Sequence, residues 1–549
     1  MEKILFLVPP NINFDNFVRP AFNERKVAKK TGEYGSLVSD MPLGLLSLSA
    51  YLQNNAQVRI KLLDFNVILN KLENFTYSSF MDLYREYLGA KELLDYAPEI
   101  IGISALFSSS YCNLLDLAEA ARITFPRALL TAGGGVATNM HKEIFRNSGA
   151  IDALCYGEGE KPLLGLVQAE NKDIFLKENP AWVTKEKYQT GGAFCNDFIE
   201  NLDAIPFLPF DLLDPQDYAS NPLLSLFPLA QAKKISMPML TSRGCPHRCC
   251  FCDSHTVHGR QMRYYSLHRI KEDLERLKRE YGAEVIVFFD DHFMADKQRV
   301  YAIIALMKEL RLTAFFPSSL ALYALDREML AALKSIGVEN LVLSAESGSN
   351  RVLKEIMHKP LDLSTVKRVV DDCRQLGIAS DIAILIGLPG ETKQDIEDTR
   401  AFLKTLNANW FRISVATPLA GSEMFDICVK KNYLKGDYLR ADFKRAVIET
   451  EDFKAEYIQE EAYRLNLELN FVGNNDLNSG NYATALKGFE NTIRVKNDHA
   501  FAYYFAAKCC RLMRQEDKYW AYKSKYLEII GDSGFWKAYA KQFNLPALE

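Results

Sequence analysis

The chain has 549 residues, and this length predicts three or four domains of ordinary size. Its hydrophobic content of 48% is enough for several buried cores, and no apolar run in the sequence is long enough to span a bilayer. The formal net charge of -4 excludes the strongly basic footprint of a nucleic-acid-binding protein. Four of the 11 cysteines lie in one short loop, and the N-terminus lacks the layout of a signal peptide. We therefore expect a cytoplasmic protein with free thiols.

Residues 1–171 alternate short apolar runs with helical patterns. This alternation predicts a doubly wound, Rossmann-like α/β domain with a parallel sheet and helices on both faces. We expect strands at 3–8, 58–63, 100–105, 128–132 and 152–156, and helices at 43–53, 113–123 and 140–147.

Glycine and hydroxyl residues follow several of these strands, at the carboxyl ends where open α/β sheets bind ligands. Because glycine permits close backbone approach, such a rim suits a large ligand laid over the sheet edge. Any one of these loops could equally be a tight turn. The candidate ligand-binding residues are Pro9, Ser104, Gly133, Gly134, Gly135, Gly157 and Glu158.

Residues 172–235 contain six prolines and weak periodicity, which predicts a linker without regular elements. From 236 to 430 strands and helices alternate again. Six such units predict a partial (β/α)6 barrel of the TIM type, open on one side, with its chemistry at the C-terminal strand ends. We expect the strands at 239–241, 285–289, 313–316, 341–344, 382–386 and 410–415, with helices between them, for example at 269–281 and 299–310.

Cys245, Cys249 and Cys252 are spaced C-x3-C-x2-C on a loop that follows the first barrel strand. Three thiolates can hold three corners of a [4Fe–4S] cube and leave one iron open, whereas electron-transfer clusters use four cysteines. The alternatives are a structural zinc site and a chance cluster of cysteines. Zinc sites usually pair two C-x2-C units, or one unit with two histidines, and no second pair follows here, although two histidines lie nearby. Cys250 is adjacent to Cys249 and should pack away from the cube.

This loop resembles the signature of the radical S-adenosylmethionine (radical SAM) enzymes, whose open iron chelates S-adenosylmethionine (AdoMet). The resemblance implies that Phe251 stacks near the adenine of AdoMet. It also implies AdoMet contacts at later strand ends, from Asp290, Asp291, Glu346, Ser347, Gly387 and Glu391. The family more often has glycines where the two aspartates stand. Each of these motifs could alternatively cap a helix or form a turn.

The N-terminal region resembles the cobalamin-binding domain that precedes the radical SAM domain in one large enzyme group. The resemblance covers the helix start at 42–45, the strand at 101–104, the glycine turn at 133–135 and the Gly-Glu-Gly-Glu segment at 157–160. It implies that the candidate residues of the sheet edge contact cobalamin. The histidine motif that ligates cobalt in other cobalamin domains is missing, and His141, the first histidine, lies outside its position. The enzyme group with this architecture also lacks the motif.

Residues 431–549 are predicted to be helical, and about 460–530 look like tetratricopeptide repeats. The run 480–489 resembles the second half of one repeat unit, and 500–526 fits a further helix pair. Because about three units are needed for independent stability, we expect this short array to pack on the barrel. It could bind a protein partner, cover the barrel mouth or stabilise the fold.

The resemblances span nearly residues 1–425 and together imply a cobalamin-dependent radical SAM enzyme. The reaction they imply methylates an unactivated carbon through a 5'-deoxyadenosyl radical and methylcobalamin, with a low-potential electron donor of the flavodoxin or ferredoxin type. The alternatives are a cyclase or oxidoreductase on the same scaffold and a non-catalytic cobalamin or AdoMet sensor. The intact cysteine triad argues against a sensor. The substrate stays open among small molecules, lipids and peptides, because a fold does not set its substrate.

Overall fold

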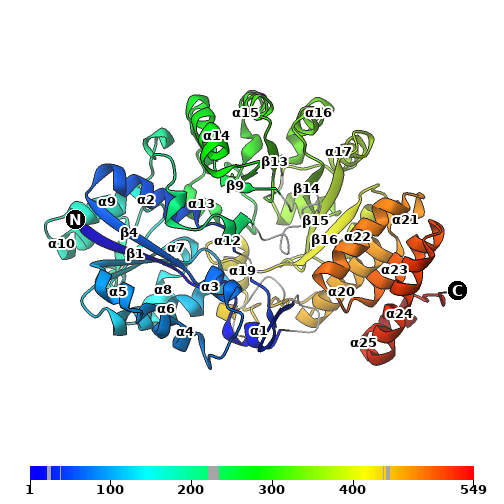
Figure 1. Ribbon diagram of the computed structural model, residues 1–549, viewed down its shortest axis with the longest axis horizontal. Coiled ribbons are helices and arrows are strands. Elements are labelled where there is room, and N and C mark those ends of the chain that lie inside the picture. The colour runs from blue at the N-terminus through cyan, green and yellow to red at the C-terminus, as the bar shows by residue number, and fades with distance from the viewer. Residues whose placement is uncertain are drawn as a thin grey trace.

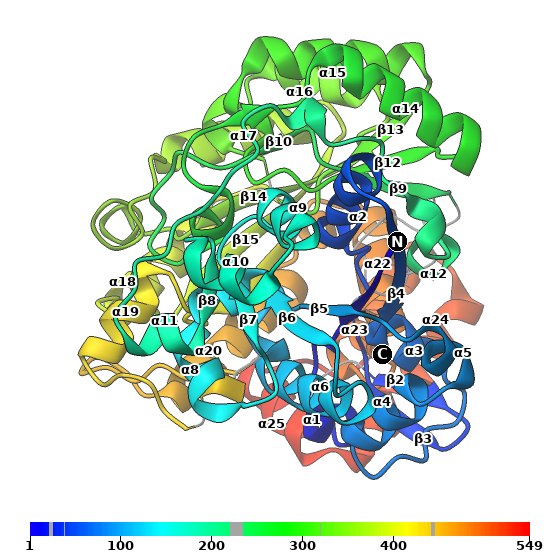
Figure 2. The same cartoon turned by 90° about the vertical axis from the view of Figure 1, so that its left-hand side faces the viewer.

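The computed structural model describes residues 1–20, 26–37, 39–219, 234–318, 320–436, 438–440 and 445–548. Three regions follow one another along the chain: an N-terminal sheet domain, a central half-barrel and a C-terminal group of helices (Figure 1). Figure 2 shows the helices of the half-barrel lying over its strands, with the N-terminal sheet below them.

A six-stranded sheet forms the N-terminal domain, in the order β4-β1-β5-β6-β7-β8. The first five strands of this order pair in parallel, so their carboxyl ends meet at one edge, whereas β8 pairs antiparallel with β7. The five strands expected from the sequence are confirmed. The strands are β1 (Glu2–Val8), β4 (Val58–Asp64), β5 (Ile100–Ser104), β6 (Leu129–Gly133), β7 (Ala153–Cys155) and β8 (Trp182–Thr184).

Helices cover both faces of this sheet, which explains why its strands read as continuous apolar runs. Along β1, Leu5 and Leu7 pack into the core on one face, and Ile4 and Phe6 pack into the core on the other. The helices are α1 (Phe14–Val18), α2 (Leu43–Asn55), α3 (Phe65–Lys71), α4 (Phe80–Leu88), α5 (Lys91–Tyr96), α6 (Tyr111–Thr124), α7 (Gly135–Asn139), α8 (His141–Asn147) and α9 (Glu160–Gln168). A hairpin of β2 (Lys26–Lys29) and β3 (Gly32–Gly35) packs against α1, and its Tyr34 side chain is buried in the core of this domain.

Regular structure continues beyond residue 171, where we expected a linker. α10 (Lys172–Glu178), β8 and α11 (Lys185–Gln189) follow one another, and the Trp182 side chain is buried in the core of the N-terminal domain. The prediction that 172–235 lacks regular elements is therefore wrong for residues 172–189. The physical reason is that five of the six prolines lie beyond residue 189, so little opposes regular structure before them. α12 (Gln216–Ala219) is a short turn of helix further along this segment.

Six parallel strands form the half-barrel, and each overlaps a strand expected from the sequence. They belong to two three-stranded sheets, β13-β12-β9 and β14-β15-β16, which are joined by a parallel bridge between Leu320 and Leu343. The strands are β9 (Ser236–Met239), β12 (Val285–Phe288), β13 (Thr313–Phe315), β14 (Asn340–Glu346), β15 (Ala379–Ile386) and β16 (Trp410–Val415). The helices are α13 (Ser254–His258), α14 (Leu267–Tyr281), α15 (Lys297–Glu309), α16 (Arg327–Ser335), α17 (Leu363–Gln375), α18 (Lys393–Lys404) and α19 (Glu423–Lys430).

α14 illustrates how local sequence sets these helices. Ser266 accepts a hydrogen bond from the Arg269 amide and so caps the N-terminus. The buried side chains recur at helical spacing as Ile270, Leu274 and Leu277, which turns one face of α14 toward the strands. Gly282 ends the helix with a φ of +67°, a conformation that glycine adopts without strain.

The C-terminal helices cover the outer edge of β16 and then stack on one another (Figure 1). Their own aromatic core includes Phe471, Phe489 and the fully buried Trp536. The helices are α20 (Ala455–Leu467), α21 (Asn475–Asn478), α22 (Tyr482–Val495), α23 (Ala500–Leu512), α24 (Glu516–Asp532) and α25 (Gly534–Gln542).

The helical region begins later than the expected residue 431. Leu434 and Ile448 form an antiparallel bridge, and the first long helix starts at Ala455. α22 and α24 begin at Tyr482 and Glu516, which are 34 residues apart, the period of tetratricopeptide repeats. The assignment to that repeat family stays a prediction.

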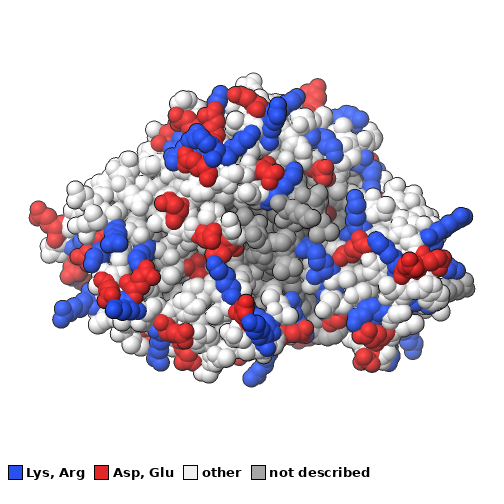
Figure 3. Space-filling model, viewed as in Figure 1, with Lys and Arg blue, Asp and Glu red and all other residues white. Residues whose placement is uncertain are grey.

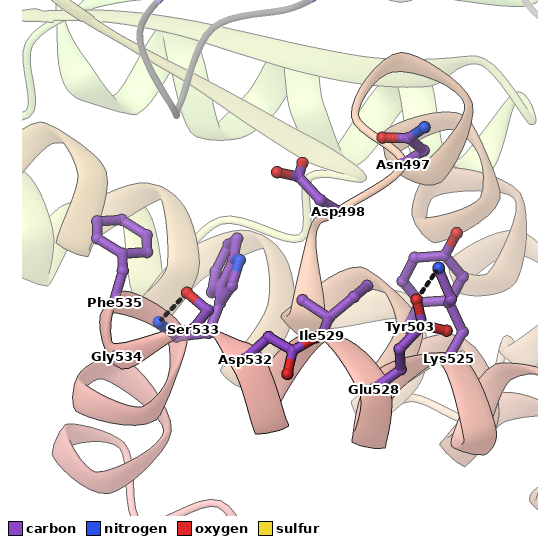
Figure 4. A pocket seen from close by; sticks show the side chains of 11 residues that line it. Asn497, Asp498, Tyr503, Lys525, Glu528, Ile529, Asp532, Ser533, Gly534 and Phe535 are labelled. Atoms are coloured by element: carbon purple, nitrogen blue, oxygen red, sulfur yellow. Dashed lines mark hydrogen bonds and ion pairs between the residues drawn. The ribbon is translucent and has the colours of Figure 1, made fainter.

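The C-terminal helices also form a pocket of about 730 Å³, bounded by α24, the start of α25 and the loop before α23 (Figure 4). Lys525 and Glu528, an ion pair at 2.5 Å, lie at its rim together with Asp498 and Asp532. Acidic and basic side chains are interspersed over the face of the molecule seen in Figure 3. Of the helices in the described ranges, none is both long and apolar enough to cross a membrane.

Candidate functional site

The cysteine loop is closed at its base by a two-residue antiparallel ladder, in which β10 (Ser242–Arg243) pairs with β11 (Arg263–Tyr264). The loop therefore starts and ends at one point. Gly244 has a φ of +90°, and a Cβ atom there would lie 2.3 Å from the carbonyl oxygen of Gln261. Only glycine fits this turn, which leads directly into Cys245.

The three thiols of the motif lie on this loop as half-buried neighbours. Burial raises the pKa of the Cys245 thiol to about 11, and the nearby Cys252 and Cys249 thiols add to that rise. The Cys252 amide donates a hydrogen bond of 3.1 Å to the Cys249 carbonyl, which curls the loop between them. Bound metal ions reverse the effect of burial, because a coordinating thiol is deprotonated.

Cys250 lies on the opposite side of the loop, in the barrel core, where it is 3% exposed. Its amide donates to the Met357 carbonyl at 3.1 Å, and its carbonyl accepts from the Met424 amide at 2.8 Å. Phe251 is half-buried and packs against the same core. These contacts anchor the loop to two distant segments of the half-barrel.

Across the described ranges, no three His, Cys, Asp or Glu side chains converge where a single metal ion would bind. A cube holds each cysteine at a different iron, so the ligands of a cluster do not need to converge on one point. The donor set of the loop, three partly exposed thiols and no fourth cysteine ligand, fits a cluster of this kind.

Asp290 and Asp291 follow β12 and face different surroundings. Asp290 is buried, and its carboxylate accepts hydrogen bonds from the Thr241 amide and hydroxyl and from the Ser242 hydroxyl, at 2.5 to 3.2 Å. These hydrogen bonds connect the loop after β12 to the segment that leads into the cysteine loop. Asp291 is exposed, and its charge contributes to the raised pKa of Cys245. Of the two, Asp291 is the carboxylate that can reach a ligand.

Glu346 ends β14 in a left-handed conformation with a φ of +64°, where the pairing with β15 is interrupted by a bulge. Its carboxylate forms an ion pair of 3.2 Å with Lys359, and both side chains are less than one-fifth exposed. The Lys359 charge acts on Cys249, whose pKa burial raises and this charge lowers. Sequence reasoning missed Lys359, because it lies 13 residues after Glu346. Ser347 is fully buried and bonds to Thr399 at 3.1 Å.

Gly387 and Glu391 shape the loop after β15. Gly387 has a φ of +90°, and a Cβ atom there would lie 2.7 Å from the Ile458 side chain of α20. One oxygen of the Glu391 carboxylate accepts hydrogen bonds from the Gly387 and Leu388 amides, at 2.6 and 3.1 Å. Glu391 thus fixes the backbone of this loop, and Gly387 itself is buried.

The strand ends of the N-terminal sheet form the edge that the sequence predicts. Gly134 has a φ of +89°, and a Cβ atom there would lie 2.7 Å from the Ala105 carbonyl oxygen. Gly133 and Gly135 flank Gly134 in this turn. Ser104 ends the neighbouring strand β5, and Pro9 follows the end of β1, the next strand of the sheet. Leu106 is 61% exposed beside the turn. A glycine cradle with an exposed apolar side chain fits a large, flat ring system.

Gly157 and Glu158 take up different positions from the rest of this edge. A Cβ atom at Gly157 would lie 1.2 Å from the Asn196 side-chain oxygen, so Asn196 occupies the space that glycine leaves. The Glu158 carboxylate is buried and binds Arg263 of the half-barrel. His141 bonds to the Thr138 carbonyl at 3.0 Å, away from the strand ends.

The glycine turn of the N-terminal domain and the cysteine loop of the half-barrel lie next to each other. α7, which follows the turn, packs against α13, which follows the cysteines. Asn139 donates a hydrogen bond of 3.4 Å to Asp253, the residue after Cys252. A Cβ atom at Gly135 would lie 3.9 Å from the same carboxylate. The two candidate cofactor sites therefore lie side by side at the boundary between the domains.

A further group of side chains that the sequence did not indicate borders the cysteine loop. The Tyr323 hydroxyl lies 2.8 Å from Nε2 of His292 and 3.1 Å from Nε2 of His247. A phenol has one proton, so both contacts are satisfied when it donates to one ring and accepts from the other. Burial lowers the pKa of His292 to about 4, and this ring is therefore neutral. The group links the cysteine loop to the loops after β12 and β13.

Two family models match the chain. The model described as the Radical SAM superfamily matches residues 239–403, which include the cysteine loop and the motifs after β12, β14 and β15. The model described as the B12 binding domain matches residues 39–167, which include the glycine turn of the sheet edge.

Curated relatives cover much of the chain at low identity. An uncharacterized methyltransferase of Pyrococcus horikoshii is 27% identical over 79% of this chain and 84% of its own length. Cytidylyl-2-hydroxyethylphosphonate methyltransferase of Streptomyces wedmorensis is 25% identical over 63% of this chain and 69% of its own length. An anaerobic magnesium-protoporphyrin IX monomethyl ester cyclase of Cereibacter sphaeroides is 24% identical, over 60% of this chain and 53% of its own length.

Two solved structures share the fold over nearly the whole chain. The cobalamin-dependent S-adenosylmethionine radical enzyme OxsB, with aqua-cobalamin and S-adenosylmethionine bound, has a TM-score of 0.60 and 14% identity, and the match covers 100% of this chain and 82% of that chain. The radical S-adenosylmethionine methyltransferase TsrM from Kitasatospora setae, with tryptophan substrate and a SAM analog bound, has a TM-score of 0.56 and 14% identity, covering 94% and 99%.

Proposed function

We propose that this chain, a member of the radical SAM superfamily that also carries a B12 binding domain, is a cobalamin-dependent methyltransferase acting on an unactivated carbon of a small molecule. The observation that carries the proposal is the contact between α7 and α13. Through this contact the glycine-lined sheet edge and the three-cysteine loop lie side by side at the boundary between the domains. A methyl carrier and a radical source must both reach the same substrate atom, and this arrangement allows it.

The residues present fit the groups that such an enzyme needs. Cys245, Cys249 and Cys252 would hold a [4Fe–4S] cluster, and the glycine turn at 133–135 would lie under cobalamin. When bound, these groups supply a methyl donor and a strongly oxidising carbon radical derived from AdoMet. The other residues of the site would bind and orient these groups and exclude water.

Lys359 is placed to bind an anionic group beside the cluster. Its ammonium lies near Cys249 and pairs with Glu346, so the carboxylate of AdoMet would find a charge partner there. The exposed Asp291 carboxylate, near Cys245, would suit the ammonium of the same molecule. The loop after β15, which begins at Gly387, would lie beside its nucleoside.

The deciding experiment reconstitutes the full chain under strict anaerobiosis with iron, sulfide and cobalamin. AdoMet and a low-potential reductant are then added, and methylcobalamin, S-adenosylhomocysteine and 5'-deoxyadenosine are quantified together. We expect all three products from the wild type and from Cys195→Ser, which alters an exposed thiol outside the loop. Cys249→Ser should lose 5'-deoxyadenosine. Formation of 5'-deoxyadenosine without the other two products would contradict methyl transfer.

The similarity to an anaerobic cyclase favours one second candidate, a radical cyclase or oxidoreductase that binds cobalamin and transfers no methyl group. The same assay separates the two functions, because a cyclase of this kind leaves cobalamin unmethylated. A small electron carrier of the flavodoxin or ferredoxin type would supply the reducing electron in either case. A protein partner of the C-terminal helices would bind away from the boundary between the sheet domain and the half-barrel.

A further inference from the structure

Four charged side chains meet at the boundary between the N-terminal sheet domain and the half-barrel, and all four are buried. Glu158 and Glu160 follow β7 of the sheet, whereas Arg243 and Arg263 lie opposite each other in the ladder of β10 and β11. Each side chain is at most 4% exposed. We refer to these four residues as the interdomain latch.

Every carboxylate of the latch binds an arginine of the other domain. Glu158 accepts from both terminal nitrogens of Arg263, at 2.6 and 2.8 Å, and lies 3.4 Å from Arg243. Glu160 accepts from Arg243 at 2.7 Å and from the Ser47 hydroxyl of α2 at 2.5 Å. The planar two-point pair between Glu158 and Arg263 fixes their relative orientation as well as their distance.

Charge balance keeps the latch ionised. Burial alone would raise the pKa of the Glu158 carboxyl. The hydrogen bonds from Arg263 and His258 and the charge of Arg243 instead hold that pKa well below its usual range. A buried pair loses its balance when one partner is removed, and the remaining charge is strongly destabilised.

Hydrogen bonds continue from the latch to the first cysteine. Nδ1 of His258 lies 2.9 Å from the Glu158 carboxylate, and Arg263 donates to the His258 carbonyl at 2.9 Å. The carbonyl of the next residue, Gly259, accepts from the Cys245 amide at 3.3 Å. The end of β7 and the start of the cysteine loop therefore belong to one bonded network.

We propose that the interdomain latch holds the sheet edge at one fixed separation from the cysteine loop, so that the domains do not swing apart between the steps of the reaction. Swinging would separate the carboxylates of Glu158 and Glu160 from their guanidinium groups and also break the contact between Asn139 and Asp253. Glu158 is then a positioning residue rather than a cobalamin contact. This inference rests on the proposed function, because it concerns how the two cofactor sites are spaced.

The test measures the separation directly in the full chain loaded with both groups. Cob(II)alamin and the reduced cluster each carry unpaired electron spin, so pulsed dipolar electron paramagnetic resonance reports the distance between them. Wild type is compared with Glu158→Gln, which conserves shape, and with Arg263→Met. The matched control is Lys161→Ala, which breaks the half-exposed ion pair with Asp197 just beyond the latch.

We expect one narrow distance in the wild type and in Lys161→Ala, unchanged by a non-cleavable AdoMet analogue, and a broad distribution in both latch variants. Cobalamin affinity of Glu158→Gln, read from its visible absorption, should equal that of the wild type. Methylation of cobalamin by AdoMet should fall about 100-fold, as a displacement near 1 Å costs in other enzymes.

Two results would contradict the proposal that the interdomain latch fixes this separation. One is a wild-type distance that changes with the non-cleavable AdoMet analogue or has two populations. The other is a Glu158→Gln protein with the wild-type distance, whether or not its cobalamin affinity falls. A wild-type chain that takes up neither cluster nor cobalamin would instead refute the proposed function, and with it this inference. Because glutamine has nearly the same shape as glutamate, Glu158→Gln still tests the proposal if Arg263→Met does not fold.

Discussion

At the scale of single residues, Glu391 shows how burial determines the protonation state of a carboxyl group. One oxygen of its carboxylate holds two backbone amides, and the other has no hydrogen-bond partner within the described ranges of the chain. Burial raises the pKa of Glu391 from 4.5 to about 8. The folded protein therefore keeps this proton at neutral pH, whereas the unfolded chain releases it.

This difference predicts a pH dependence of stability. Between pH 4.5 and 8 the unfolded state loses the proton and the folded state keeps it, so the wild type loses up to about 1.4 kcal/mol of stability per pH unit through Glu391. Glu391→Gln keeps an oxygen for the two amides and cannot ionise. The melting temperature of the variant, relative to wild type, should rise from pH 5 to pH 8. A difference that does not change with pH would contradict the raised pKa.

Lys359 gives a second prediction at this scale. Lys359→Met removes the ammonium beside Cys249, and the dissociation constant for AdoMet should rise about 10- to 100-fold, the range expected for one charged hydrogen bond. Equilibrium dialysis of the cluster-loaded protein measures it. Lys354→Met is the control, because Lys354 is 61% exposed and pairs with Asp362. Equal effects of the two substitutions would rule out a specific role for Lys359.

At the scale of elements, the open edge of β16 is closed by a side chain rather than by a strand. Asn470 is fully buried in the turn after α20, where its amide donates to the Phe411 carbonyl at 2.7 Å and accepts from the Phe411 amide at 2.8 Å. It therefore pairs as a neighbouring strand would. The unpaired edge of a sheet is otherwise a site of association.

Asn470→Ala leaves both polar groups of Phe411 buried without partners. The free energy of unfolding should fall by about 3 kcal/mol, as expected for two lost hydrogen bonds. Urea denaturation followed by circular dichroism measures the change. Asn55→Ala, at an exposed position with one local hydrogen bond, should have little effect. A small loss in both variants would mean that water reaches the edge of β16.

The elements differ in how far the sequence predicts them. The parallel strands of both domains could be predicted because they are buried on both faces and read as apolar runs. β8 could not, since it has three residues and follows Pro180 closely. The cysteine triad is visible from spacing alone. The partners of Glu158 are not, because Arg263 lies 105 residues away and only the folded chain brings the two together.

At the scale of the whole molecule, the C-terminal helices belong to the half-barrel. Arg400 of α18 forms ion pairs with Glu461 of α20 and with Glu468 of the turn that follows, and Ile458 packs over Gly387. The helices therefore support the loop that we assign to AdoMet. They do not form a separate unit joined by a flexible chain.

A chain that ends at residue 453 tests this arrangement. Removing α20 to α25 exposes the edge of β16 and the underside of the Gly387 loop, so we expect an insoluble or unfolded product. Soluble yield and circular dichroism measure the outcome. A soluble, folded product that still takes up iron and sulfide would show that the C-terminal helices are an independent module.

The anchoring of the Cys250 backbone to two segments of the half-barrel also affects repair. Protein contacts at Cys250 help to hold the loop, so we expect it to keep its shape when the cluster is lost. When air destroys the cluster, the polypeptide should remain intact and ready to be refilled. We expect an air-bleached sample to regain its iron–sulfur absorbance with fresh iron and sulfide, without denaturant. After exposure to oxygen, the cell would then need to supply iron and sulfide but would not need to synthesise the protein again.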